Sequence, residues 1–164
     1  MSDSRFQAKR AVRAYRQTID AKPDAVFPLL CPVREDEWLD GWKCTMLYSA
    51  SGLVEEGAVF STSSAGEEDT VWVVTRHDPA ARRVEFARFT PQSRTCVLKI
   101  AVSQLGDDRS YVDISYTYTS IAEAGNRFIE KWSEKAFLDA VGFWEQSTNH
   151  FVKTGGKLSR GAAV

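Results

Sequence analysis

Arg88 and Glu37 are the charged residues whose surroundings in the sequence best fit chemistry in an apolar pocket. Arg88 lies in the segment VEFARFT, and a buried cation requires an anion, such as Glu37, Asp40 or a ligand carboxylate. Glu37 is a candidate general base if it is desolvated, although it lies in an acidic run that is typical of a solvated helix face. The sequence does not identify catalytic residues beyond these candidates.

The direction in which Arg88 points depends on which alternating set of its strand faces the interior. If Val84 and Phe86 point inward, Arg88 does too. If Ala87 and Phe89 point inward instead, Arg88 is solvated. Both alternatives remain open at this point.

Aromatic side chains are the second group from which a pocket can be built. Tyr116 and Tyr118 share one face of the segment YVDISYTYT, and a buried phenol needs a hydrogen-bond partner, which a ligand oxygen, backbone or water can supply. Trp38 and Trp42 flank the Asp40-Gly41 turn, either as a wall for a ligand or as ordinary core residues. The ligand-binding residues that we predict are Trp38, Trp42, Phe60, Trp72, Phe86, Arg88, Tyr116, Tyr118, Trp132 and Phe137.

Cysteine and histidine are too few and too scattered to indicate a metal site. Cys31, Cys44 and Cys96 have no close spacing, which favours reduced thiols over a disulfide framework. The two histidines, His77 and His150, lie far apart and belong to no zinc-binding motif. We therefore expect neither a metal nor a cofactor.

The composition predicts one soluble globular domain. The 164 residues are 43% hydrophobic and 26% charged, with a formal net charge of −1. This charge argues against a nucleic-acid or anionic-membrane partner. Because no apolar run approaches the roughly 20 residues that span a bilayer, and because residues 1–5 lack the apolar region of a signal peptide, we expect a cytoplasmic protein without membrane insertion.

Turn signals and apolar periodicity divide the chain into seven strands and three helices. We expect a first strand at 11–20, a short helix from Pro23 that ends at Pro32, and a second short helix at 33–39. A long helix is expected from 123 to about 154, before Gly155-Gly156. The six strands between them are predicted at 43–49, 58–64, 70–78, 83–90, 95–105 and 110–121, and their short connections favour an antiparallel meander.

This order of elements resembles the START-like, helix-grip superfamily, also called SRPBCC, which includes polyketide cyclase-like and pollen-allergen-like proteins. The segments IDAKPDAVFPLLCPVREDEWLDGW and EAGNRFIEKWSEKAFLDAVGFWEQSTNHFV carry the resemblance. It implies an α+β fold, in which a curved seven-stranded antiparallel sheet, with two short helices after strand 1, is gripped by a long C-terminal helix. The expected domain spans 10–155, between an N-terminal extension at 1–9 and a flexible C-terminal tail at 156–164.

The resemblance implies that a small hydrophobic or amphipathic molecule, such as a lipid, a polyketide or an aromatic compound, binds between sheet and helix. It implies no universal set of catalytic residues. One alternative is an enzyme of cyclase, dehydratase or hydrolase type that uses acid–base groups in the same cavity. Another is a protein-interaction module with a filled cavity, and either a monomer or a homodimer is compatible with the sequence.

Overall fold

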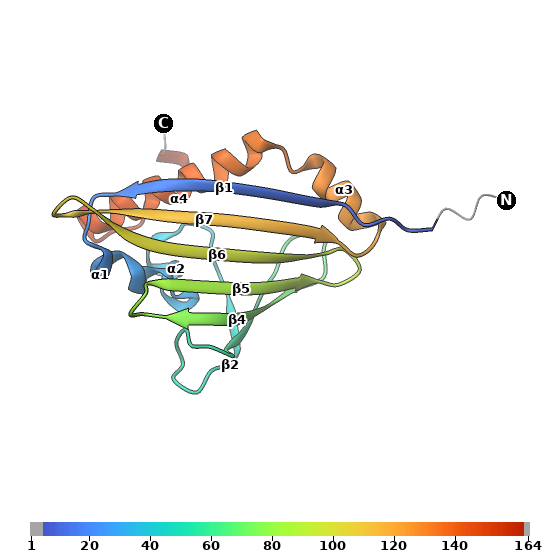
Figure 1. Cartoon of the computed structure of the whole chain (residues 1–164), viewed down its shortest axis with the longest axis horizontal. Coiled ribbons are helices and arrows are strands. Elements are labelled where there is room, and N and C mark those ends of the chain that lie inside the picture. The colour runs from blue at the N-terminus through green and yellow to red at the C-terminus, as the bar shows by residue number, and fades with distance from the viewer. Residues whose placement is uncertain (1–4, 163–164) are drawn as a thin grey trace.

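The computed structural model, which describes residues 5–162, contains one antiparallel sheet with its helices on one face (Figure 1). The sheet has seven strands in the order β1-β7-β6-β5-β4-β3-β2. Every pair of neighbouring strands is antiparallel, which confirms the predicted meander of six strands. The structure adds that β1 pairs with β7. The strands are β1 (Arg10–Ile19), β2 (Thr45–Tyr48), β3 (Val59–Thr62), β4 (Thr70–Asp78), β5 (Arg83–Thr90), β6 (Arg94–Leu105) and β7 (Arg109–Ser120).

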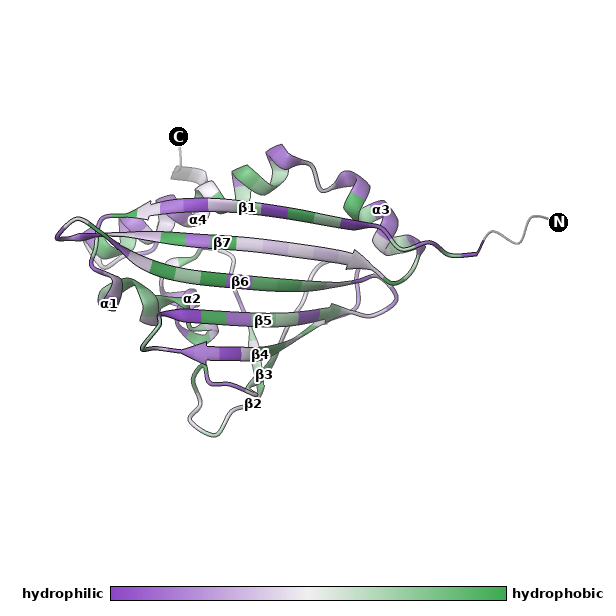
Figure 2. Cartoon of the chain, in the orientation of Figure 1, coloured by the Kyte–Doolittle hydropathy of each residue, from purple (hydrophilic) through white to green (hydrophobic). Residues whose placement is uncertain are grey.

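Alternation along each strand divides the sheet into a buried inner face and an exposed outer face. In β6 the residues Cys96, Leu98, Ile100 and Val102 are buried while Lys99 between them is exposed, as the sequence predicts. Figure 2 shows the same alternation as bands of apolar and polar residues along β5 and β6. The inner face therefore carries the core and any enclosed site.

The long C-terminal helix α4 (Glu134–Thr154) is fixed to the inner side of β1 by polar contacts as well as by apolar packing. Gln17 is buried and its side-chain amide donates to the carbonyl of Val141 at 2.9 Å. Glu145 accepts from the Tyr15 hydroxyl at 3.2 Å and from the Thr18 backbone N–H at 2.6 Å. Because these contacts attach α4 at the β1 edge, space remains between the helix and the middle strands.

The single helix predicted at 123–154 is divided in two, which corrects that expectation. α3 (Glu123–Lys131) ends before Trp132, and α4 begins after Ser133, whose hydroxyl accepts from the Ala136 N–H at 3.0 Å as an N-cap. The Arg13 guanidinium donates to the Trp132 carbonyl at 2.9 Å and lies 5.0 Å from the centre of its ring. Trp132 is thus held outside both helices, over the end of the sheet.

Short helices and the C-terminal segment close the other end of the inner face. They are α1 (Pro23–Val26), the 3₁₀ turn η1 (Phe27–Leu30), α2 (Pro32–Trp38) and the 3₁₀ turn η2 (Arg160–Ala162). The segment expected to be a flexible tail contacts α2 and the turn after it: Leu158 bridges to Leu39, and the Arg160 N–H donates to Asp40 at 3.0 Å. Of the expected extensions, residues 1–4 and 163–164 lie outside the described residues.

Candidate functional site

Two neighbouring cavities lie between the inner face of the sheet and α4. The larger has a volume of about 240 Å³ and the smaller about 70 Å³. They share Leu39, Tyr116 and Trp144 as lining residues, so they meet at these side chains. Together they form the candidate site.

Aromatic rings from strands and helices make up most of the walls. In the larger cavity Tyr118 and Trp132 pack edge to face with ring centres 4.5 Å apart, because the break between α3 and α4 places Trp132 over β7. In the smaller cavity Phe60 and Trp72 stack at 5.3 Å, since they are paired on neighbouring strands β3 and β4. Such walls favour a flat, apolar ligand.

Arg88 points into the larger cavity, which decides the question left open by the sequence. Its strand β5 pairs it with buried Trp72 on one side and buried Cys96 on the other, so it lies on the inner face. Its guanidinium carbon lies 4.6 Å from the ring centre of Trp72, 5.0 Å from that of Tyr118 and 5.5 Å from that of Tyr116. Among residues 5–162 no carboxylate lies within ion-pair distance of it; Glu67, which pairs with Arg94 at 2.7 Å, acts on Arg88 only at longer range.

Glu35 on α2 is the acidic residue of the site, and the sequence analysis missed it. Its side chain lines the smaller cavity, the residue is 7% exposed, and no hydrogen-bond partner among residues 5–162 contributes to its pKa. Burial raises the pKa of Glu35 to about 8, because the carboxylate is removed from water without a cation beside it. At neutral pH most molecules therefore carry a protonated acid here.

Tyr116 on β7 is the polar residue that the cavity of Arg88 and the cavity of Glu35 have in common. It lines both cavities, and both Arg88 and Glu35 act on its hydroxyl electrostatically. Burial raises the pKa of Tyr116 to about 12, against the opposing effect of the Arg88 cation. The hydroxyl remains a neutral donor at physiological pH and has no protein partner among the described residues.

The structure brings nine of the ten predicted binding residues to the two cavities. Arg88, Tyr116, Tyr118, Trp132 and Phe137 line the larger one, and Trp42, Phe60, Trp72, Phe86 and Tyr116 line the smaller one. Trp38 lines neither. It is completely buried in the core, where its indole N–H donates to the carbonyl of Leu29 at 2.9 Å.

Glu37 and Asp40, the acidic residues suggested as partners of Arg88, bind other groups. Glu37 is exposed on α2 and pairs with Arg34 at 3.2 Å, so it is not desolvated, the condition on which it would act as a base, and the solvated alternative describes it. Asp40 binds the backbone N–H of Arg160. An anion for Arg88 is therefore not supplied by either of these residues.

Trp144 and Arg160 are cavity residues that the list of predicted binding residues does not include. The Trp144 ring lines both cavities, and its buried indole N–H has no acceptor among the described residues. Arg160 lines the larger cavity, with its guanidinium carbon 4.7 Å from the ring centre of Phe143. The helical periodicity of Trp144 with Ala140 and Phe137 marks it as inward, whereas nothing in the sequence near Arg160 indicates its contact.

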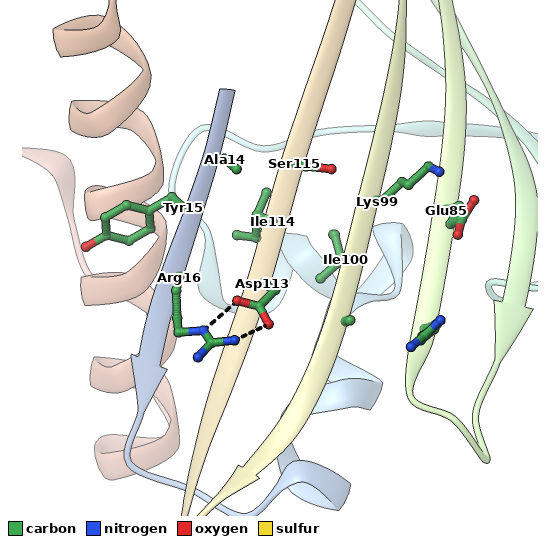
Figure 3. Close-up of a pocket in the computed structure, with 11 residues that line it drawn as sticks. Ala14, Tyr15, Arg16, Glu85, Lys99, Ile100, Asp113, Ile114 and Ser115 are labelled. Carbon is green, nitrogen blue, oxygen red and sulfur yellow. Dashed lines mark hydrogen bonds and ion pairs between the residues drawn. The ribbon is translucent and has the colours of Figure 1, made fainter. Parts of the chain in front are cut away.

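The outer face of the sheet has a hollow of about 440 Å³, shown in Figure 3. Arg16 and Asp113 cross it as a bidentate ion pair at 2.7 and 2.9 Å. Lys99 and Glu85 lie on the same face, while Tyr15 points away toward α4 (Figure 3). Because this hollow is wide, has Tyr15 as the one aromatic residue of its lining and contains an already paired cation, the inner cavities are the better candidate site.

Metal ligands and membrane-spanning helices are not found in the described part of the chain. Between residues 5 and 162 no three His, Cys, Asp or Glu side chains come together as a metal site would require. None of the helices there has the length and apolar character that crossing a bilayer demands.

Comparison with known proteins identifies the fold. No protein-family model and no curated protein sequence matches the chain. Among solved structures, a point mutant of norcoclaurine synthase from Thalictrum flavum, in complex with a transition-state analogue, matches with a TM-score of 0.68. It is 14% identical, over 92% of this chain and 99% of that one.

Two further structures have the same arrangement. The ZhuI aromatase/cyclase from Streptomyces sp. R1128 has a TM-score of 0.64 and 16% identity over 92% of this chain and all of that one. Ara h 8.0201 has a TM-score of 0.61 and 11% identity over 89% and 99% of the two chains. The chain thus has the helix-grip fold expected from its resemblance to the START-like proteins, and identities this low establish the fold alone.

Proposed function

We propose that the protein binds a small aromatic molecule carrying a negatively charged oxygen, with the ring between the sheet and α4 and the oxygen at Arg88. The observation that carries this proposal is a guanidinium group facing an aromatic cavity without a carboxylate partner among residues 5–162. A cation in apolar surroundings is costly unless it is paired, and a ligand anion supplies the pair.

The size and chemistry of the cavities support the same class of ligand. Their volumes of about 240 and 70 Å³ fit a molecule of one or two rings. The unpartnered donors of Tyr116 and Trp144 border the same space and favour a ligand with oxygen acceptors. The structural neighbours norcoclaurine synthase and ZhuI aromatase/cyclase support an enzyme as the alternative.

Calorimetric titration with 2-naphthoate and with its neutral analogue 2-naphthamide tests the proposal. We expect the carboxylate to bind more tightly by about tenfold to a hundredfold, which corresponds to a hydrogen bond between charged groups. Arg88→Gln should remove this preference. Arg88→Lys should keep part of it, because lysine retains the positive charge but cannot form the two parallel hydrogen bonds of a guanidinium group.

Arg83→Gln is the matched control, because Arg83 lies on the same strand and is exposed on the outer face. It should keep the preference for naphthoate, and circular dichroism should show that each variant is folded. Equal binding of the two probes by the natural protein, no binding of naphthoate at millimolar concentration, or an unchanged preference in Arg88→Gln would contradict the proposal.

A further inference from the structure

We propose that Glu35 makes the joined cavities a proton-transfer site, in which a bound aromatic ketone or keto acid loses and regains a proton at the carbon next to its carbonyl group. This inference rests on the proposed function, because the molecule must first bind beside Arg88. It adds a reaction to that site and assigns the reaction to a residue on a different element.

The first argument is the position of Glu35. An unpaired carboxyl side chain is rarely placed in an apolar interior, because its charged form is poorly solvated there. Glu35 is nevertheless buried and lines a cavity, whereas its neighbours Asp36 and Glu37 on the same short helix are exposed. The carboxyl group therefore faces the smaller cavity and is largely shielded from bulk water.

The second argument is the arrangement of charge across Tyr116. Arg88 lines the cavity on one side of this residue and Glu35 lines the cavity on the other. A carbonyl oxygen near Arg88 and Tyr116 would leave the adjacent carbon in the smaller space, toward Glu35. A base and an electrophilic group on opposite sides of a carbonyl compound are the two components that enolisation requires.

The reaction is balanced without a cofactor. The Glu35 carboxylate removes a proton from the carbon, the C–H electron pair forms a C=C bond, and the carbonyl π electrons move to oxygen. Arg88 and the Tyr116 hydroxyl donate hydrogen bonds to that negative oxygen. In D₂O the carboxylic acid exchanges its proton with solvent and returns a deuteron to the carbon, so that the net change is C–H to C–D.

The pH dependence follows from the protonation state of the base. Because the pKa of Glu35 is about 8, the carboxylate fraction rises through neutral pH, and the exchange rate should rise with it and level off above about pH 8. The titratable and charged groups from the strands that act on this region are Tyr116 on β7, Arg88 on β5 and Cys96 on β6. Those from the short helices, the segment before β2 and the C-terminal segment are Cys31, Asp36, Cys44 and Arg160. Burial raises the pKa of the Cys44 thiol, which keeps it neutral in this range.

Phenylpyruvate is the probe, since it combines a ring, a carboxylate, a ketone and an exchangeable methylene group. Proton NMR in D₂O measures the loss of the methylene signal, and calorimetry measures binding separately. At saturation we expect exchange about a hundredfold or more above the rate in buffer, as is typical of general base catalysis. Glu35→Gln should return the rate to that of buffer while phenylpyruvate still binds.

Glu37→Gln is the control, because this exposed residue lies on the same helix and should leave the rate unchanged. Glu35→Asp should retain part of the exchange, with the same pH trend. Exchange at the buffer rate in the natural protein, although phenylpyruvate binds, would overturn the proton-transfer inference and leave the proposed function intact. Undiminished exchange in Glu35→Gln would overturn it as well, and failure of phenylpyruvate to bind would overturn both.

Discussion

At the scale of the residue, the buried acid on α2 makes the stability of the protein depend on pH. The pKa of Glu35 is about 8 in the folded chain and about 4.5 when exposed. Between these values the folded state keeps a proton that the unfolded state has lost, so the folded state binds more protons. The free energy of unfolding therefore falls as the pH rises from about 5 to about 8, and this loss is complete above the folded pKa.

Glu35→Gln should remove that dependence. At pH 4, below both pKa values, Glu35 is mostly neutral in the folded and the unfolded chain, so the two proteins should be about equally stable. At pH 8.5 the free energy of unfolding of the variant should exceed that of the natural protein by at least about 1 kcal/mol. A pKa difference of one unit already corresponds to about 1.4 kcal/mol, and the pKa of Glu35 differs by more than one unit between the two states. Urea denaturation at the two pH values measures this, with exposed Glu37→Gln as the control. A variant no more stable than the natural protein at pH 8.5 would show that Glu35 titrates normally.

The sequence indicated Arg88 as a candidate but left its direction open, and it could not distinguish Glu35 from its acidic neighbours. A run of charges on a short helix is usually solvated, and that interpretation is correct for Asp36 and Glu37. The available signal was helical spacing: Glu35 precedes Trp38 by three residues and therefore shares its face. Because Trp38 is completely buried, this face points inward and takes Glu35 with it.

At the scale of the element, the break between α3 and α4 determines where the cavity is closed. Apolar residues continue at helical spacing through Trp132, which is why the sequence predicts one uninterrupted helix. The competing signals are the N-cap at Ser133 and the Arg13 contact to the Trp132 carbonyl. The second of these joins residues distant in the chain, so local spacing cannot reveal it.

Glycines in the two helices should respond oppositely to alanine. A Cβ atom at Gly125 in α3 would lie 1.9 Å from the backbone oxygen of Ser93, whereas one at Gly142 in α4 would meet nothing within 4 Å. Gly125→Ala should therefore lower the free energy of unfolding by about 1–3 kcal/mol or more. Gly142→Ala should raise it by about 0.5–1 kcal/mol, because alanine is the better helix former.

Chemical denaturation measures the free energy of unfolding of both variants. Gly125→Ala tests the close packing of α3, and Gly142→Ala tests helix propensity in α4. An unchanged stability in Gly125→Ala would mean that α3 does not pack against the β5–β6 turn as closely as the structure has it. A destabilised Gly142→Ala would indicate a contact on that face of α4 that the structure does not contain.

At the scale of the whole molecule, the fold explains why the cavity lies where it does. Attachment of α4 along β1 leaves the middle strands uncovered at one side, and aromatic side chains from β3 to β7 extend into this space. The order of strands and helices was sufficient to predict this architecture, since each element has a clear period and clear ends. The volume and the charges inside the cavity depend on long-range packing, which a single sequence does not specify.

The protonated acid in the cavity also changes how the intact protein should migrate in an electric field. The formal net charge of −1 counts Glu35 as ionised, so near neutral pH the folded molecule carries about one negative charge fewer than its formula indicates. Native isoelectric focusing should therefore give the same band for Glu35→Gln as for the natural protein. Glu37→Gln, which deletes a charge on the surface, should focus at a higher pH, and after denaturation in urea the two variants should coincide.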